Sequence, residues 1–287
     1  MDLCKEKDIR ALLGRHGFRF SKSMGQNFLI EGWVPRDIAD ASGADEGCGV
    51  LEIGPGIGPL TVQLARRAGK VAAIELDRSL LPILDETLAP YDNVTVIPGD
   101  AMKLDLAALA AEQFPGLTPL ACANLPYNIT TPVLTALIEA GCFRAITVMI
   151  QREVALRICA APGTADYGAF SLFCQYHTVP EFLFEVPPEC FLPAPKVTSA
   201  VIRLTPRETP PQNLVDEAFF FRVVRAAFAQ RRKTLLNSLN SAFGDRLDKA
   251  QLRQAIAAAG LPEGVRGERL GIGEFAALAR ALRELLG

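Results

Sequence analysis

The sequence predicts an α/β protein in which a mostly parallel sheet is followed by a small all-α domain. Up to about residue 150, short apolar strands alternate with segments of helical spacing, a pattern typical of βαβ units. Beyond the Pro-rich segment 206–211, only helical patterns follow. We therefore predict one domain at 1–207, which includes an N-terminal arm, and a helical domain at 208–287.

The predicted strands are short and apolar. Five are expected in the parallel sheet, at 49–53, 70–76, 93–97, 119–123 and 145–150. Two more, at 180–186 and 199–204, are close in sequence and are expected to form an antiparallel edge. Helices are expected at 60–68, 78–88, 130–140, 151–160, 170–176, 216–228, 232–242, 247–259 and 272–286.

Composition and charge narrow the classes of protein. Apolar residues make up 49% of the 287 residues and the net charge is only -2, which indicates a folded core rather than a disordered chain. No apolar run approaches the ~18 residues of a membrane span, and the charged N-terminus lacks the apolar region of a secretory signal. A cytoplasmic protein is expected. Net charge does not indicate a nucleic-acid binder, but a local basic patch could still bind a polyanion.

Metal chemistry is not expected. The seven cysteines are scattered without a C-x-x-C pair, and most of them lie in apolar segments, which is typical of reduced, buried side chains. Only His16 and His177 could add imidazole ligands to a zinc site.

A glycine-rich loop, E-I-G-P-G-I-G at 52–58, follows the first predicted strand and precedes a helix. Glycines such as Gly54 and Gly56 let a backbone turn sharply and approach a ligand closely. The spacing is G-x-G-x-G, with Pro59 where a dinucleotide fingerprint would have its last glycine. A tight structural turn would also explain the motif.

Acidic residues end the next two strands. Glu75 follows the glycine loop by about 20 residues, a spacing at which a carboxylate accepts hydrogen bonds from ribose hydroxyls. Asp100, in Gly99-Asp100-Ala101, could accept one from an adenine amino group. A solvated strand end and a turn cap are the respective alternatives. Because ligands of open α/β sheets bind at the carboxyl ends of strands, a nucleoside cofactor is predicted, either NAD-like or S-adenosylmethionine.

The segment Asn124-Leu125-Pro126-Tyr127 ends the fourth strand and favours methyl transfer. The nitrogen of an adenine amine is a poor nucleophile because its lone pair is delocalised into the ring. An asparagine oxygen and the carbonyl of Leu125 could accept its two N–H groups as positive charge develops. Pro126 lacks an N–H and has a fixed φ, and Tyr127 offers a face on which a flipped-out base can stack. A Pro-containing turn with a core tyrosine is the structural alternative.

Together these motifs resemble a known family. The residues S-M-G-Q-N-F-L at 23–29, E-I-G-P-G-I-G, I-E-L-D, G-D-A and N-L-P-Y-N-I are similar to those of the ribosomal RNA adenine dimethyltransferases, and most similar to the bacterial small-subunit (16S) type. Further matches are M-I-Q-R-E-V, V-P-P, F-L-P-A-P-K-V, S-A-V-I-R-L and Q-R-R-K-T-L, so the resemblance covers nearly the whole chain.

The resemblance implies a Rossmann-like class I S-adenosylmethionine methyltransferase sheet with a small C-terminal all-α domain. The implied reaction places two methyl groups on N6 of each of two adjacent adenines near the 3′ end of 16S rRNA. A monomer acting on 16S rRNA or the immature small ribosomal subunit, without a membrane or a metal, is expected. Arg222, Arg225, Arg231, Arg232 and Lys233 are candidate RNA-binding residues, with a solvated helix face as the alternative.

The resemblance also assigns roles within the site. Cofactor-binding roles fall on Asn27, Leu29, Gly54, Gly56, Glu75, Asp100, Ala101 and Asn124. Glu75 would hold the ribose and Asp100 the cofactor adenine. Catalytic roles fall on Asn124, Leu125, Pro126, Tyr127 and Phe191. Phe191 would cover the target base opposite Tyr127, with ordinary core packing as the alternative.

Four other functions share some of these features. A large-subunit adenine methyltransferase that confers macrolide resistance is the nearest, but R-R-K-T-L-L-N-S-L and the long helical end favour the small-subunit type. A DNA adenine methyltransferase would need a target-recognition domain. A ribosome-assembly module without activity does not need the intact cofactor motifs. An NAD-linked oxidoreductase gives no reason for N-L-P-Y or G-Q-N-F-L.

Overall fold

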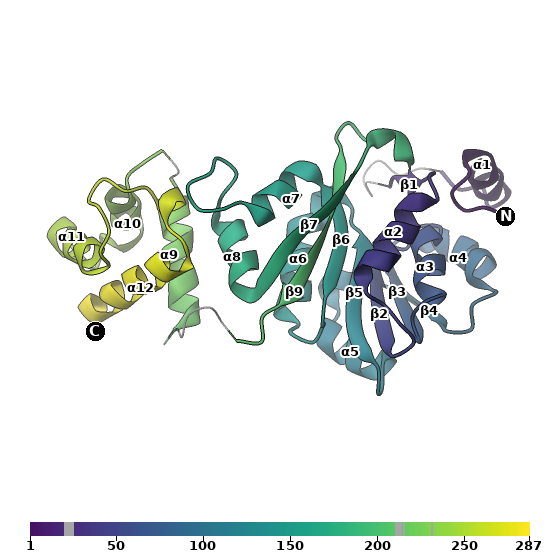
Figure 1. Ribbon diagram of the computed structural model, residues 1–287, viewed down its shortest axis with the longest axis horizontal. Helices are drawn as coiled ribbons and strands as arrows, with labels where there is room; N and C mark the ends of the chain where they lie inside the picture. Colours follow the sequence, from purple (N-terminus) through teal and green to yellow (C-terminus); the bar gives the residue numbers. More distant parts are fainter. Residues whose placement is uncertain (20–25, 210–213, 215, 231) are drawn as a thin grey trace. The chain divides into compact units, whose positions relative to one another are not determined.

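A seven-stranded sheet forms the centre of the first structural unit (Figure 1). The computed structural model describes residues 1–19, 26–209, 214, 216–230 and 232–287. The strand order is β4-β3-β2-β5-β6-β9-β7, with β2 to β6 parallel and β9 antiparallel to β6. The strands are β2 (Cys48–Ile53), β3 (Lys70–Glu75), β4 (Val94–Pro98), β5 (Thr118–Asn124), β6 (Ile146–Gln151), β7 (Thr178–Val186) and β9 (Ser199–Pro206). The five predicted parallel strands are thus confirmed, and β7 and β9 are neighbours at the edge of the sheet, where β9 runs antiparallel to β6.

Helices cover both faces of this sheet. On one face, Ile38 of α2 and Leu64 of α3 pack in one apolar cluster with Leu120 of β5. The helices α5 and α6 lie behind the sheet in Figure 1. Burial on both faces explains why β2 is apolar at nearly every position. The helices of this part are α1 (Glu6–Arg15), α2 (Trp33–Ser42), α3 (Pro59–Ala65), α4 (Leu81–Leu88), α5 (Leu106–Gln113) and α6 (Thr130–Glu139), and α7 (Arg152–Cys159) runs from this unit into the second.

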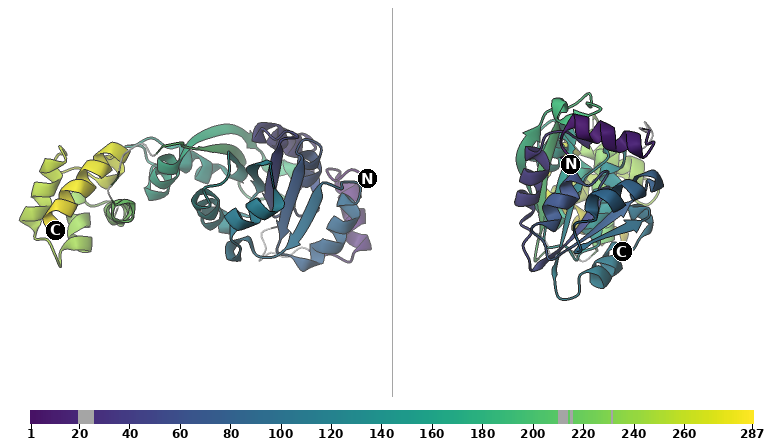
Figure 2. Two further views of the ribbon diagram at one scale, coloured as in Figure 1. Left: turned by 90° about the horizontal axis from the view of Figure 1, so that it is seen from below. Right: turned by 90° about the vertical axis from the view of Figure 1, so that its right-hand side faces the viewer.

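The N-terminal arm contacts the rest of the first unit in two places. A two-stranded ribbon of β1 (Phe28–Leu29) and β8 (Phe191–Leu192) pairs Leu29 with Phe191. The helix α1 lies beside α4 in both views of Figure 2, and its Leu12 packs in one cluster with Ile57 of the glycine loop. The arm therefore reaches the loops at the carboxyl ends of the strands.

The second unit is helical, as predicted. Its helices are α8 (Ala169–His177), α9 (Glu217–Phe228), α10 (Leu235–Phe243), α11 (Lys249–Ala258) and α12 (Ile272–Leu286). Their core contains the fully buried Tyr167, Phe220 and Phe275. Asp216 caps α9 by accepting a hydrogen bond from the Phe219 N–H at 2.8 Å. In the described part of the chain, no helix has the length and apolar character needed to cross a membrane.

The structure differs from the predicted boundaries in two places. One unit comprises Met1–Ala155 and Pro180–Pro206, and the other Leu156–Val179 and Arg207–Gly287. The segment 156–179 therefore groups with the C-terminal helices, although the sequence placed it before the 207/208 boundary. Core contacts explain this: Leu172 and Tyr176 of α8 belong to the same cluster as Phe220.

The second difference concerns a helix start. The helix predicted from 232 begins at Leu235. Before it, the Lys233 N–H donates to the Gln230 carbonyl at 2.9 Å, which is the hydrogen bond of a turn and not of a helix.

Candidate active site

A pocket of about 260 Å³ lies at the carboxyl ends of β2, β3, β4 and β5. This is the edge at which open α/β sheets bind ligands. The structure brings every predicted cofactor-binding and catalytic residue to the lining of this pocket: Asn27, Leu29, Gly54, Gly56, Glu75, Asp100, Ala101, Asn124, Leu125, Pro126, Tyr127 and Phe191. Their joint placement is confirmed, whereas their individual roles remain predictions.

The glycine loop turns through left-handed backbone conformations. Gly54 and Gly56 have φ values of 70° and 63°, which residues with a Cβ rarely adopt. At Gly54 an added Cβ would meet nothing within 4 Å, so the floor of the pocket is open there for a ligand. Pro59 is the first residue of α3, a position at which its missing N–H has no cost. Helix initiation therefore accounts for the departure from the dinucleotide spacing.

Glu75 is fixed with its carboxylate at the pocket wall. Its Oε1 accepts the Asp77 N–H at 2.8 Å and its Oε2 accepts the Gly56 N–H at 3.2 Å. Only 5% of the residue is exposed, and burial raises the pKa of its carboxyl group. Each oxygen of an ionised carboxylate can accept a further hydrogen bond. The residue can therefore accept ribose hydroxyls without moving.

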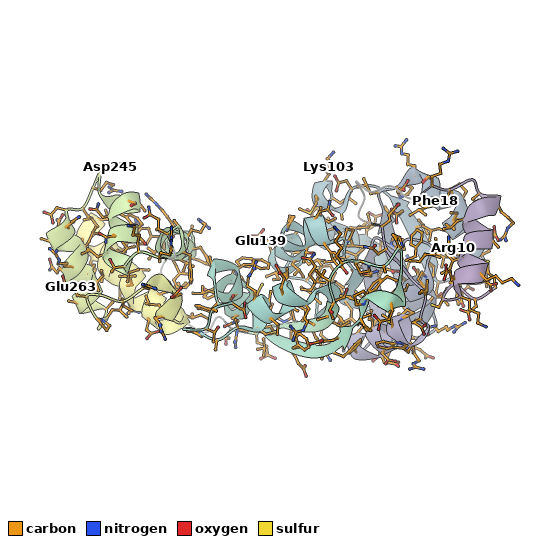
Figure 3. The ribbon with its side chains drawn as sticks, turned by 90° about the horizontal axis from the view of Figure 1, so that it is seen from above. Arg10, Phe18, Lys103, Glu139, Asp245 and Glu263 are labelled. Carbon is orange, nitrogen blue, oxygen red and sulfur yellow. The ribbon has the colours of Figure 1, made fainter. Side chains whose placement is uncertain are left out.

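Asp100 begins a 3-10 turn, η3 (Ala101–Lys103). Its Oδ1 accepts the Met102 N–H at 3.0 Å, so the turn cap that the sequence left as an alternative is present. The residue also lines the pocket, and its Oδ2 lies 3.8 Å from the Lys103 Nζ. Lys103 itself extends outward (Figure 3). Capping the turn holds the Asp100 carboxylate at the pocket, so the two interpretations are compatible.

The N-L-P-Y segment leaves the sheet at the end of β5. The Leu125 N–H donates to the Met149 carbonyl at 3.1 Å, and the Pro126 carbonyl accepts the Ile129 N–H at 3.2 Å. These bonds fix the backbone on both sides of the turn. The Tyr127 hydroxyl lies 2.6 Å from the Ser199 Oγ, and burial raises the pKa of this tyrosine, so the phenol stays protonated.

Phe191 is both a core residue and a pocket residue. It is 3% exposed and belongs to the apolar cluster that contains Leu29 and Val186. Its pairing with Leu29 joins β8 to the N-terminal arm. The core-packing alternative is therefore observed, and the same ring lines the pocket.

Three residues that line or support the pocket have no role predicted from the sequence. The first is Gln26, whose Nε2 donates to Asp77 Oδ2 at 2.7 Å and so connects the arm to the loop after β3. The second is Ser199, which contacts the Tyr127 hydroxyl. The motif residues at 23–25 lie outside the described residues. Gln26 and Ser199 both stand in segments that carry the family resemblance, but a motif does not show which residue a side chain meets across the fold.

Glu52, in the glycine motif, is the third. It lines the pocket and is 1% exposed, and its Oε2 has no hydrogen-bond partner among the described residues. Burial raises the pKa of Glu52 to about 8. The Thr61 hydroxyl, which is also buried, lies near enough to Glu52 to lower this pKa, but burial dominates.

Glu52 should make stability depend on pH. A carboxyl group whose pKa is higher in the folded state stabilises the fold at low pH, and that contribution is lost as the pH rises toward about 8. We expect Glu52→Gln to match the wild-type free energy of unfolding near pH 5 and to exceed it by a few kcal/mol (order of magnitude) at pH 9. Urea unfolding at the two pH values measures this. If the variant and the wild type differed by the same free energy of unfolding at pH 5 and at pH 9, Glu52 would not be protonated in the folded state at pH 5.

The candidate RNA-binding residues lie in the second unit. Arg222 and Arg225 are on α9, and Arg232 and Lys233 follow it in the turn before α10, while Arg231 lies outside the described residues. The Arg222 guanidinium lies over the Phe243 ring, 4.9 Å from its centroid, which positions this cation. Arg225, Arg232 and Lys233 are exposed, and none forms an ion pair within the described part of the chain. These three are therefore free to meet an external anion.

The fold and the site define the class of protein. The sheet is parallel with one antiparallel strand near its edge. A glycine loop follows β2, acidic residues stand at the ends of β3 and β4, and N-L-P-Y stands at the end of β5. These features are typical of a class I S-adenosylmethionine-dependent methyltransferase that acts on an amine. The model of the family "Ribosomal RNA adenine dimethylase" matches residues 17–266. The chain belongs to this family.

Relatives and solved structures agree with this assignment. The chain is 49% identical over 287 residues to "Ribosomal RNA small subunit methyltransferase A" of Geobacillus thermodenitrificans (99% of this chain, 98% of the relative). It is 48% identical to the protein of the same name from Bacillus licheniformis (99% of each). A dimethyladenosine transferase from Plasmodium falciparum aligns with a TM-score of 0.73 at 25% identity (90% and 98%). The 23S rRNA methyltransferase ErmE aligns with a TM-score of 0.68 at 26% identity (90% and 100%).

Proposed function

We propose that this protein transfers methyl groups from S-adenosylmethionine to N6 of two adjacent adenines near the 3′ end of 16S rRNA. One observation carries the proposal: a single pocket joins the glycine loop and Glu75 to Asn124 and Tyr127. The first two suit a nucleoside cofactor, and the last two suit a planar base that carries an amine. The names of relatives 46–49% identical to this chain support the small subunit as the substrate.

On the cofactor side, we propose roles for four residues that line the pocket. Glu75, held by the Asp77 and Gly56 N–H groups, accepts the ribose hydroxyls, and Asp100 accepts the adenine amino group. Asn27 and Leu29 enclose the cofactor from the arm. Bound S-adenosylmethionine supplies a methyl group on a sulfonium, whose leaving group departs neutral. The protein therefore has mainly to position the amine and exclude water.

On the target side, the amine is held by the segment after β5. The Asn124 side-chain oxygen and the Leu125 carbonyl accept its two N–H groups, which favours a tetrahedral nitrogen as positive charge develops. The Tyr127 ring stacks on the base, and Phe191 borders the opposite side. The product ammonium loses its proton to water. Catalysis thus depends on orientation rather than on a strong general base.

RNA binding is assigned to the basic residues of the second unit. Arg225, Arg232 and Lys233 are exposed and free of acidic partners within the described residues, and Arg222 is held over Phe243. Cations of this kind contact phosphates and position the RNA without reading its sequence. We further propose that the protein acts as a monomer in the cytoplasm on assembling small subunits.

Charge reversal on this surface should weaken RNA binding. Arg225→Glu combined with Arg232→Glu is expected to lower affinity for a small-subunit RNA fragment. The slope of log K against log salt should become shallower by roughly 0.7 to 0.9 for each phosphate that the variant no longer neutralises. Filter binding at several salt concentrations measures both effects.

Arg253→Glu is the matched control for the charge reversal, because Arg253 is exposed in the same unit but paired with Glu263 at 2.9 Å. It should leave the affinity and the salt slope close to the wild-type values. Unchanged affinity in the double variant would remove this surface from the RNA interface.

The proposed reaction is tested with purified components. The protein is incubated with labelled S-adenosylmethionine and either small subunits, large subunits or naked 16S rRNA from cells that lack the modification. We expect dimethyladenosine, identified by mass spectrometry after nuclease digestion, in the small-subunit RNA. Transfer to large-subunit RNA alone would support the large-subunit alternative instead.

A further inference from the structure

The Tyr127 hydroxyl meets a partner from a strand that is distant in sequence. Its oxygen lies 2.6 Å from the Ser199 Oγ, although the two residues are 72 positions apart. Ser199 is fully buried and is the first residue of β9. The bond therefore joins a loop residue at the pocket to a strand in the interior of the sheet.

The position of Ser199 is set by strand pairing. It lies opposite Gln151 at the end of the antiparallel ladder between β6 and β9. On its other side, β6 pairs with β5, where Met149 lies opposite Asn124. The strand that holds Asn124 and the strand that holds Ser199 thus flank the same strand, so the hydroxyl has a fixed place relative to the amine-binding end of β5.

We propose that Ser199 is a positioning residue that fixes the ring of Tyr127 for stacking on the target adenine. The proposal rests on the proposed function and concerns the base side of the same pocket. Tyr127 opens a 3-10 turn (Tyr127–Ile129) and is only half-buried, so packing alone does not enclose its ring. A hydrogen bond at the far end of the phenol holds the ring at two points and prevents it from swinging about Cα–Cβ. The ring is then ordered before the base arrives, and binding loses less conformational freedom.

A purely structural role makes different predictions. If the bond only satisfied a buried serine hydroxyl, its loss would lower stability without a selective effect on the RNA substrate. If it fixes the ring, its loss should affect the RNA step and leave cofactor binding unchanged. Removing either hydroxyl should then have the same effect, because both changes break one bond.

The test is a double-mutant cycle of Ser199→Ala, Tyr127→Phe and the combined variant. We expect each single variant to lower kcat/KM for RNA by roughly 3- to 10-fold and the double variant to lower it no further than the more impaired single variant. The dissociation constant of S-adenosylhomocysteine should stay at the wild-type value. With 2-aminopurine in place of the target adenine, both single variants should show weaker fluorescence quenching of the bound, flipped base.

Ser42→Ala is the matched control. Ser42 is also a buried serine whose hydroxyl donates a hydrogen bond, here to the Ala39 carbonyl at 2.7 Å, but it lies on α2 outside the pocket. Ser42→Ala should lower stability, as the loss of a buried serine hydrogen bond does, but it should leave kcat/KM for RNA at the wild-type value. If Ser199→Ala does not fold, Tyr127→Phe removes the same bond without changing the sheet and carries the test.

Wild-type kcat/KM for RNA in Tyr127→Phe and Ser199→Ala, or multiplicative losses in the double variant, would overturn the proposal. These outcomes differ from failure of the proposed function, in which the wild-type protein itself would place no methyl group on adenine.

Discussion

Replacing Asn124 with alanine is expected to lower kcat for adenine methylation by roughly 10²- to 10³-fold. The amide oxygen removed by this change is the acceptor that we assign to an N–H of the target amine, and its contribution grows as positive charge develops on the nitrogen. The fold should survive, because the backbone of Asn124 pairs with β6 opposite Met149 and an alanine keeps that backbone. Single-turnover rates at saturating cofactor and RNA isolate this chemical step.

Asn93→Ala is an informative control for this change. The Asn93 Nδ2 donates to the carbonyls of Ala65 and Ala68 at 2.9 and 3.0 Å, so its loss should lower the free energy of unfolding but not the single-turnover rate. Asn124→Ala should lower the single-turnover rate but not the free energy of unfolding. A wild-type rate in a folded Asn124→Ala protein would rule out activation of the amine by this residue.

Replacing Glu75 with glutamine is expected to raise the dissociation constant of S-adenosylhomocysteine by roughly 10- to 100-fold. The amide loses the negative charge, and because its NH₂ group cannot accept, one of the two hydrogen bonds from the Asp77 and Gly56 N–H groups that hold the carboxylate is lost. Because burial raises the pKa of Glu75, acidification should weaken cofactor binding in the wild type at a higher pH than for an exposed glutamate. Isothermal titration calorimetry measures both effects.

Glu139→Gln is the matched control, since Glu139 is an exposed carboxylate at the end of α6 (Figure 3). It should leave the dissociation constant unchanged. For Glu75→Gln, activity should recover in part at high cofactor concentration, because the loss is in binding. An unchanged constant in Glu75→Gln would mean that another residue holds the ribose.

Most of the pocket could be predicted from the sequence because its residues stand where parallel strands end. A strand that leads into a glycine loop, followed by strands that end at or just before Glu75, Asp100 and Asn124, brings those groups to one edge whenever the strands are parallel. The five strands have strong apolar patterns, and neighbouring pairs align with one another over four or five positions. Pattern and topology together therefore suffice for the cofactor side.

The remaining features depend on contacts between distant segments. Ser199 meets Tyr127 across 72 positions and Gln26 meets Asp77 across 51, and a motif does not show such pairs. The segment 156–179 joins the C-terminal helices through Tyr167, Leu172 and Tyr176, although nothing local marks a boundary there. The helices α2 and α5 were not predicted. α2 contains Pro35, which argues against a helix in a sequence, and α5 is apolar on most sides, which weakens its helical periodicity.

The activity that we propose for this protein is dimethylation of adjacent adenines near the 3′ end of 16S rRNA. Primer extension across that region, in cells with and without the gene, tests it most directly, because dimethylation of N6 blocks base pairing and stops the polymerase. We predict a strong stop with the gene, read-through without it, and restoration by the wild-type protein but not by Asn124→Ala. A stop of equal strength in both strains would contradict the claim.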